Sequence, residues 1–291
     1  MKRVLKWVGI ILGGLLAIIV LAYVTISVVS ASRLNRAYEV TADLNLNVSH
    51  DPESIAEGKR LYTIMCQSCH GEDLAGQTFA DVMTGQIQVA NLTTGSGGIG
   101  GTHSDEDIAR AVWYGVKPDG SPTVIMPPEL SPAVNVEDME NLIAYIRSVP
   151  PVNTENIEMK LGPMMRVMHA TKGFPLVTAE FVEMNRPPAG AISADDVMAY
   201  GEQRAAFCTA CHGAEFTGNS MAGGPNITPH ETAIGNWTEE EFGRAVRKGV
   251  RPDGSQISSE MPWEAMSLYS DAEIHAIWTY LQTVEPVARA Q

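Results

Sequence analysis

The sequence reads CQSCHG at residues 66–71 and CTACHG at residues 208–213. Each stretch places two cysteines two residues apart and follows the second one directly with a histidine. The chain has 291 residues and four cysteines, so the two motifs contain all of its cysteines. No thiol is left for a catalytic cysteine or for a disulfide elsewhere.

A CxxC pair is compatible with three kinds of site. A thioredoxin-like dithiol does not need the histidine, and a structural zinc site would have to join pairs that lie 142 residues apart. Covalent haem attachment needs all three residues, because the thiols add to the haem vinyl groups and the histidine becomes the proximal iron ligand. The motifs predict two covalently attached haem c groups, with zinc and a plain disulfide as the weaker alternatives. The attachment residues are Cys66, Cys69 and His70, and Cys208, Cys211 and His212.

Residues 7–29 form a 23-residue apolar run that contains no charge and has basic residues on both sides. Such a run can span the hydrocarbon core of a bilayer, which is about 30 Å thick. A cleavable signal peptide is the alternative, because small residues around Val29, Ser30 and Ala31 offer a cleavage site, but the run is longer than the usual signal segment. We expect residues 1–36 to be an uncleaved, single-pass signal anchor. Since haem is attached outside the cytoplasmic membrane in bacteria, the haem domains should lie on its periplasmic side.

The charge is unevenly distributed along the chain. The formal net charge is −14 at pH 7, yet residues 1–36 contain only basic charges, so the remainder is strongly acidic. Nucleic acid is therefore not an expected partner, because a phosphate backbone binds basic surfaces.

An internal repeat follows the anchor. Residues 105–121 and 239–255 match at an offset of 134, and after one inserted residue the offset becomes 135. The repeat predicts two homologous domains at residues 37–150 and 193–291, each with its own haem. We expect the connector at 151–192 to be an ordered strap, because it is rich in Met, Val, Leu and Phe, with a short apolar turn at MMRVMHA.

The hydrophobic periodicity of both repeats is helical, and no alternating strand pattern competes with it. Ser104 and Thr238 are predicted helix N-caps because Asp107 and Glu241 follow at the third helical position, and Ser193 is a further predicted cap. The fold class is therefore expected to be all-α. Helices are predicted at residues 54–66, 104–116, 136–149, 195–208, 238–250 and 270–284.

Each haem iron also needs a sixth ligand. Met126 and Met261 are the candidates because they match across the repeat and each precedes a proline. His103 and His230 lie in roughly comparable loops and keep a bis-histidine arrangement open.

The motifs as a set resemble class I cytochrome c domains in tandem. The segment from PNITP through RKGVRPDGS to MPW is similar to the cytochrome subunits of bacterial membrane-bound dehydrogenases and respiratory complexes. The resemblance implies small helical bundles around edge-exposed haem groups, with His70 and Met126, and His212 and Met261, as axial ligands. Two features depart from it: the first repeat reads MPPE where the second reads MPWE, and several dehydrogenase cytochrome subunits carry three haem motifs.

The expected function is electron transfer in a membrane-bound respiratory chain. The chain would serve as a subunit of a dehydrogenase or of a quinol-oxidising or oxidase complex, with redox proteins as partners and no catalysis of its own. GSGGIGG at 95–101 contains GxGxxG but neither follows a strand nor opens a βαβ unit, so it is not a dinucleotide fingerprint. A diheme peroxidase or thiosulfate-oxidising cytochrome with one open haem is the alternative, and a haem sensor would need a signalling domain.

Overall fold

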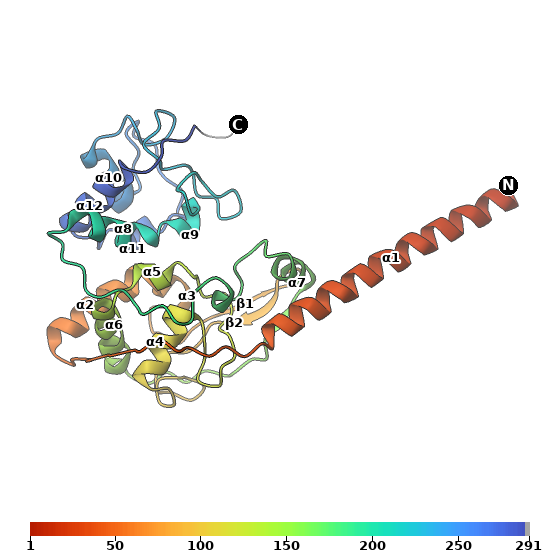
Figure 1. Cartoon of the computed structure of the whole chain (residues 1–291), viewed down its shortest axis with the longest axis horizontal. Coiled ribbons are helices and arrows are strands. Elements are labelled where there is room, and N and C mark those ends of the chain that lie inside the picture. Colours follow the sequence, from red (N-terminus) through yellow and green to blue (C-terminus); the bar gives the residue numbers. More distant parts are fainter. Residues whose placement is uncertain (289–291) are drawn as a thin grey trace.

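The computed structural model describes residues 1–288, which form one long helix and two lobes. Helix α1 (Lys2–Leu34) projects from the body as a single rod, and the two lobes lie one above the other beside its base (Figure 1). The first lobe contains α2 (Pro52–Met65), α3 (Gln67–His70), α4 (Asp105–Tyr114), α5 (Leu130–Ala133) and α6 (Val136–Ser148). The second contains α8 (Val197–Ala206), α9 (Thr209–His212), α10 (Glu239–Lys248), α11 (Trp263–Met266) and α12 (Asp271–Leu281).

The helices begin mostly where local capping chemistry predicts. Ser104 and Thr238 form capping boxes with Asp107 and Glu241, so both predicted caps are confirmed. The predicted cap at Ser193 is wrong. Helix α8 begins after Asp196, whose side chain accepts a hydrogen bond from the Ala199 amide at 3.2 Å.

In each lobe the helix before the haem motif crosses the closing helix at very short range. In the first lobe α2 packs on α6, and in the second α8 packs on α12. A Cβ atom placed on Gly58 would lie 1.8 Å from the Asn141 carbonyl oxygen, and one on Gly201 would lie 2.1 Å from that of Ala276. Only glycine allows the two backbones to approach this closely.

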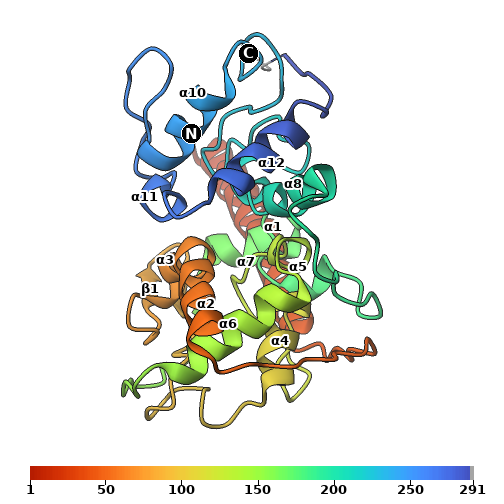
Figure 2. The ribbon, with the colours of Figure 1, turned by 90° about the vertical axis from the view of Figure 1, so that its left-hand side faces the viewer.

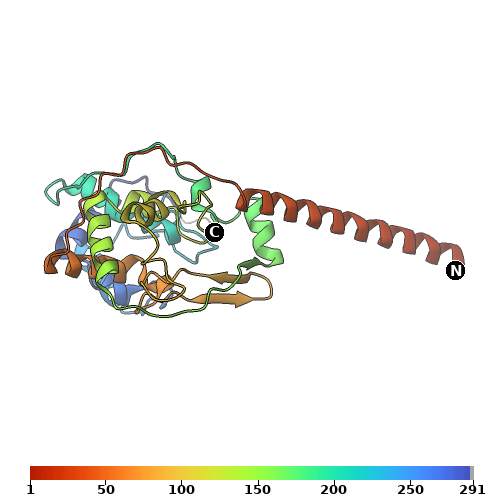
Figure 3. The same cartoon turned by 90° about the horizontal axis from the view of Figure 1, so that it is seen from below.

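The chain is mostly helical, in agreement with the expected all-α class, and the one addition to that prediction among the described residues is a small antiparallel sheet. It consists of β1 (Thr78–Asp81), β2 (Gly85–Gln88) and β3 (Lys160–Leu161) in the order β1-β2-β3. The hairpin forms because the Asp81 carboxylate accepts hydrogen bonds from the Met83 and Thr84 amides at 2.7 and 3.2 Å, which closes the turn. The connector supplies the third strand. Figure 3 shows the hairpin below α7 (Pro163–Ala170), on the side where α1 leaves the body.

The connector is ordered and holds the base of α1. The predicted short turn is a helix, α7, whose His169 side chain is fully buried and hydrogen-bonded to the Ser30 hydroxyl at 3.0 Å. Arg33 of α1 forms an ion pair with Glu180, which ends the 3₁₀ turn η1 (Thr178–Glu180), and also donates to the His169 and Ala170 carbonyls. These contacts fix α1 to the connector, whose strand β3 pairs with β2 of the first lobe.

Two arginines cross between the lobes in opposite directions. Arg60 of α2 pairs with Glu273 of α12 at 2.9 Å, and Arg204 of α8 pairs with Asp138 of α6 at 2.8 Å. Each arginine lies on the helix that leads into a haem motif, and each carboxylate lies in the first turn of the other lobe's closing helix. Figure 2 shows these four helices on both sides of the boundary between the lobes.

Candidate functional site

The two CxxCH motifs adopt the same local structure. Helix α2 ends directly before Cys66 and α8 ends at Ala206, two residues before Cys208, and in each motif a single turn, α3 or α9, carries the second cysteine and the histidine. Gly71 and Gly213 follow with φ of 81° and 79°, a conformation that favours glycine and turns the chain sharply after the histidine. The four cysteines form no disulfide within residues 1–288, and each pair lies at one turn.

Both motif histidines are oriented by a backbone carbonyl. Nδ1 of His70 donates to the Ala90 carbonyl at 2.9 Å, and Nδ1 of His212 donates to the Pro225 carbonyl at 2.7 Å. Because a carbonyl only accepts, the proton is on Nδ1 and the Nε2 lone pair remains free for a metal. Burial lowers the pKa of both imidazoles, so they are neutral at pH 7. This arrangement fits an axial ligand of a haem iron.

The thiols fit covalent attachment better than the other two kinds of CxxC site. Burial raises the pKa of Cys66 and of Cys208 to about 12, which is opposite to the lowered pKa of a reactive redox dithiol. The cysteine pairs also do not form a shared zinc site. Within residues 1–288, no three His, Cys, Asp or Glu side chains gather closely enough to hold a metal ion.

Sequence reasoning missed the residues that hold the histidine-orienting loops. The Asn91 amide donates to the Val152 carbonyl at 2.7 Å, and the Asn226 amide donates to the Val287 carbonyl at 2.6 Å. Each asparagine directly follows the residue whose carbonyl binds the histidine, so it fixes that loop to the segment after the closing helix. The two asparagines match at an offset of 135, and this signal could have identified them from the sequence.

Met126 and Met261 lie in equivalent loops and pack against the same apolar core as the cysteines Cys66 and Cys208. The two loops are held differently. The amide before Met126 donates to the Leu176 carbonyl of the connector at 2.7 Å, whereas the Met261 amide donates within its own loop to the Ser258 carbonyl at 3.1 Å. His103 and His230 lie in turns where their Nδ1 atoms bond threonine hydroxyls at 3.0 and 2.9 Å.

The difference between MPPE and MPWE has a structural reason. In the second lobe the Trp263 ring lies against Gly249, and a Cβ atom there would be 2.7 Å from the ring. In the first lobe Thr178 of the connector takes this place beside the equivalent Gly115, and a Cβ atom on Gly115 would lie 2.4 Å from the Cβ atom of Thr178. The connector therefore supplies to the first lobe the contact that the second lobe makes with its own tryptophan.

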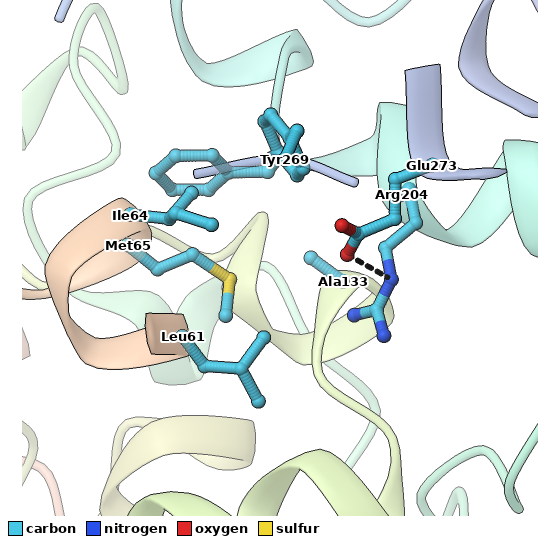
Figure 4. Close-up of a pocket in the computed structure, with 8 residues that line it drawn as sticks. Leu61, Ile64, Met65, Ala133, Arg204, Tyr269 and Glu273 are labelled. Atoms are coloured by element: carbon cyan, nitrogen blue, oxygen red, sulfur yellow. Dashed lines mark ion pairs between the residues drawn. The ribbon is translucent and has the colours of Figure 1, made fainter. Parts of the chain in front are cut away.

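A small cavity lies at the boundary between the lobes, close to the start of both haem motifs. Its volume is about 10 Å³, roughly the space of one water molecule. Figure 4 shows Met65 of α2 on one side and Tyr269, Glu273 and Arg204 of the second lobe on the other. Phe207 completes the lining, and both it and Met65 directly precede the first cysteine of a motif. The two attachment sites therefore begin at the boundary between the lobes.

Comparisons with known proteins agree with this geometry. Residues 55–150 match the family model "Cytochrome c", and residues 196–281 match "Cytochrome C oxidase, cbb3-type, subunit III". The two matched regions correspond to the first and second lobes. The chain thus carries cytochrome c domains.

Curated relatives include cytochrome subunits of several dehydrogenases. The chain is 38% identical over 97 residues to the fructose dehydrogenase cytochrome subunit of Gluconobacter japonicus, a match covering 28% of this chain and 20% of the relative. It is 38% identical over 99 residues to the cytochrome c subunit of the quinone alcohol dehydrogenase of Gluconobacter oxydans, covering 29% and 20%. The match to the gluconate 2-dehydrogenase cytochrome c subunit of Pantoea cypripedii is 35% over 101 residues, covering 30% and 23%. The chain thus spans about a fifth of the length of these relatives.

Proposed function

We propose that this chain is a membrane-anchored diheme cytochrome c that transfers electrons within a respiratory chain, as the electron-transfer subunit of a dehydrogenase or of a quinol-oxidising or oxidase complex. Residues 1–36 would be the anchor, 37–150 and 193–291 the two haem domains, and 151–192 the connector. The observation that carries the proposal is the duplicated site. In both lobes a CxxCH turn presents two thiols beside an imidazole whose Nδ1 proton is held by a carbonyl.

Equivalent residues of the two lobes would have the same roles in haem binding. Cys66 and Cys69, and Cys208 and Cys211, would attach a haem, with His70 or His212 as one axial ligand. Met126 and Met261 would supply the opposite ligand. The haem iron provides one-electron chemistry when bound, and a His–Met pair favours a high potential.

The geometry of the lobe boundary supports electron exchange between the two sites. Met65 and Phe207, the residues directly before Cys66 and Cys208, both line the cavity of Figure 4, and the Arg60–Glu273 and Arg204–Asp138 pairs hold the two lobes together around it. Electrons would enter at one haem, pass across this boundary and leave from the other.

The likeness to dehydrogenase cytochrome subunits supports a dehydrogenase as the electron donor. The apolar helix α1, long enough to cross a membrane and exposed along its apolar length, supports a location on the periplasmic face of the bacterial cytoplasmic membrane. A signal sequence would have the same composition, so retention of α1 is a separate prediction.

The first experiment is to purify the native protein from gently solubilised membranes by its haem absorbance, count haem c per chain, and identify the retained proteins by mass spectrometry. Two haems together with a dehydrogenase subunit would support the proposal in full. A quinol-oxidising or oxidase subunit would support the respiratory role with a different donor. A single haem, or a peroxide-dependent spectral change at one haem, would contradict it and favour the peroxidase alternative.

A further inference from the structure

A cleft of about 480 Å³ lies beside the last turn of α1, outside the two motif sites. Its walls come from three parts of the chain: the end of α1, the loop that follows α4, and the connector around β3 and the start of α7. The volume lies within the range of about 300–1,000 Å³ that is usual for small-molecule sites.

The position of the cleft along α1 corresponds to the polar surface of a bilayer. Ser30 and Leu34 line it, and they come directly after the apolar run at residues 7–29. The last six residues of α1, 29–34, span about 9 Å along the helix axis, which is similar to the roughly 5–8 Å thickness of one headgroup layer. Because Ser30 and Arg33 fix α1 to the connector, the cleft is held at this level. This step rests on the proposal that α1 spans the membrane.

The charge of the cleft is opposite to that of the body. Lys117, Lys160 and Arg166 line it together with one carboxylate, Glu158, in a chain whose net charge is −14. Lys160 pairs with Glu158 at 3.1 Å, and both side chains are largely exposed. Lys117 and Arg166 form no ion pair with any carboxylate in residues 1–288. The Arg166 side chain donates through Nε to the Leu161 carbonyl at 2.9 Å, which leaves its two amino groups available.

The rest of the lining includes polar side chains, Ser30, Asn35 and Ser121, and an apolar part that contains Leu34, Val124 and Met159. A cleft with free cations and an apolar wall, open at the level of the headgroups, matches a phosphate attached to acyl chains. A neutral headgroup would leave Arg166 without a counterion, and Lys117 with only the nearby Asp119 carboxylate. We propose that this cleft binds the phosphate of an anionic phospholipid and thereby fixes the body against the membrane surface.

Native mass spectrometry of the haem-loaded, full-length protein tests the proposal. The protein is reconstituted in nanodiscs of phosphatidylglycerol or of phosphatidylcholine and then released into the gas phase. We expect one retained phosphatidylglycerol and little phosphatidylcholine. The double variant Lys117→Gln/Arg166→Gln should lower retention about tenfold or more, as expected for the loss of two cations at a lipid surface. The matched control is Lys59→Gln/Lys248→Gln, which removes two exposed cations elsewhere and should change nothing.

Three outcomes would overturn the lipid assignment: equal retention of both lipids by wild type and variant, retention of a quinone instead of a phospholipid, or saturation of the cleft by added inorganic phosphate without any lipid. Alkaline extraction of native membranes distinguishes failure of the lipid proposal from failure of the proposal that α1 is a membrane anchor. A chain without an anchor is released by alkali, whereas an anchored chain without the lipid site stays in the membrane and retains no phospholipid.

Discussion

Arg204 donates to both carboxylate oxygens of Asp138, at 2.8 and 2.9 Å, although the two residues belong to different lobes. Asp138 at the same time completes the capping box of α6 by accepting from the amide of the N-cap residue Asn135. A residue that starts a helix in one lobe is thus also the counterion of the other lobe. The lobes are joined through charges that are 4% and 7% exposed.

Replacement of Arg204 by Met should destabilise the protein strongly. It would leave Asp138 and Glu273 buried without this partner, and breaking a buried pair on one side costs about 3–5 kcal/mol. Chemical denaturation of the haem-loaded protein measures the change. Asp271→Asn is the control, because Asp271 pairs with Arg247 while its side chain is 97% exposed, and such a pair contributes about 0–1 kcal/mol. Equal effects of the two substitutions would show that the lobe boundary does not depend on this pair.

Gly58→Ala and Gly201→Ala should each lower the free energy of unfolding by about 1–3 kcal/mol, because the added methyl group would overlap a backbone carbonyl of the crossing helix. Gly243→Ala in α10 is the matched control. Its Cβ would meet no backbone atom and only the Ile274 side chain, at 3.3 Å, so the higher helix propensity of alanine should offset the smaller steric cost and leave the free energy of unfolding within about 1 kcal/mol of the wild type. Thermal unfolding of the three variants decides the matter, and a neutral Gly58→Ala would refute the close crossing.

The contact between α1 and the connector should weaken in acid. Burial lowers the pKa of His169, with the nearby Arg33 acting in the same direction and Glu180 opposing both. In the unfolded chain His169 takes up a proton near pH 6.5, whereas in the folded chain it does so only at lower pH. The free energy of unfolding therefore falls as the pH drops below about 6.5. Comparison of melting temperatures from pH 5 to 8 should show a smaller slope for His169→Asn, which keeps a partner for Ser30 but does not titrate. An unchanged slope would assign the acid sensitivity to other groups.

The two lobes should respond differently to loss of a matched side chain. The Trp113 indole donates to the Val134 carbonyl at 2.7 Å, while at the equivalent place in the second lobe Arg247 donates to the Tyr269 carbonyl at 2.9 Å. Trp113→Ala should cost about 3–5 kcal/mol because it empties a buried site. Arg247→Ala should cost less, since that side chain is partly exposed. Trp113→Phe removes the hydrogen bond together with part of the ring volume, and it should cost more than the roughly 1 kcal/mol of the hydrogen bond but less than Trp113→Ala. Chemical denaturation measures both losses of unfolding free energy. A larger loss for Arg247→Ala than for Trp113→Ala would contradict the prediction.

Removal of one proposed thioether ligand should affect one haem alone. Met261→Leu keeps the size of the side chain but removes the sulfur, so half of the haem signal should shift to a lower potential in a spectroscopic redox titration. Met266→Leu, five residues later in the buried core, is the control and should leave both potentials in place. If Met261→Leu leaves both potentials unchanged, another residue is the ligand.

The parts of the fold that the sequence predicts are those with local causes. The starts of α4 and α10 follow from a hydroxyl followed three residues later by a carboxylate, and both ends follow from glycines with φ of 65°. The haem turns follow from the motifs. The hairpin at residues 78–88 was missed because each strand has four residues and is completed by a strand from the connector.

The contacts between lobes were missed for a different reason. Arg60 and Arg204 do not occupy equivalent positions in the repeat, since Arg60 precedes its haem motif by six residues and Arg204 by four. Comparing the two halves therefore gave no sign that they act as a pair. The lipid-facing cleft likewise joins three distant segments, and only the folded chain brings them together.

The way α1 meets the body has a consequence for how far the proposed haem groups can travel. Ser30 and Arg33 are fixed to the connector within the helix itself, so no slack segment would separate a membrane-spanning α1 from the body. A cytochrome domain on a long flexible linker can explore a volume around its anchor whose radius is set by the length of the linker. This chain would move with its helix, and a docking partner would have to come within the radius of the body by lateral diffusion or be assembled beside it permanently.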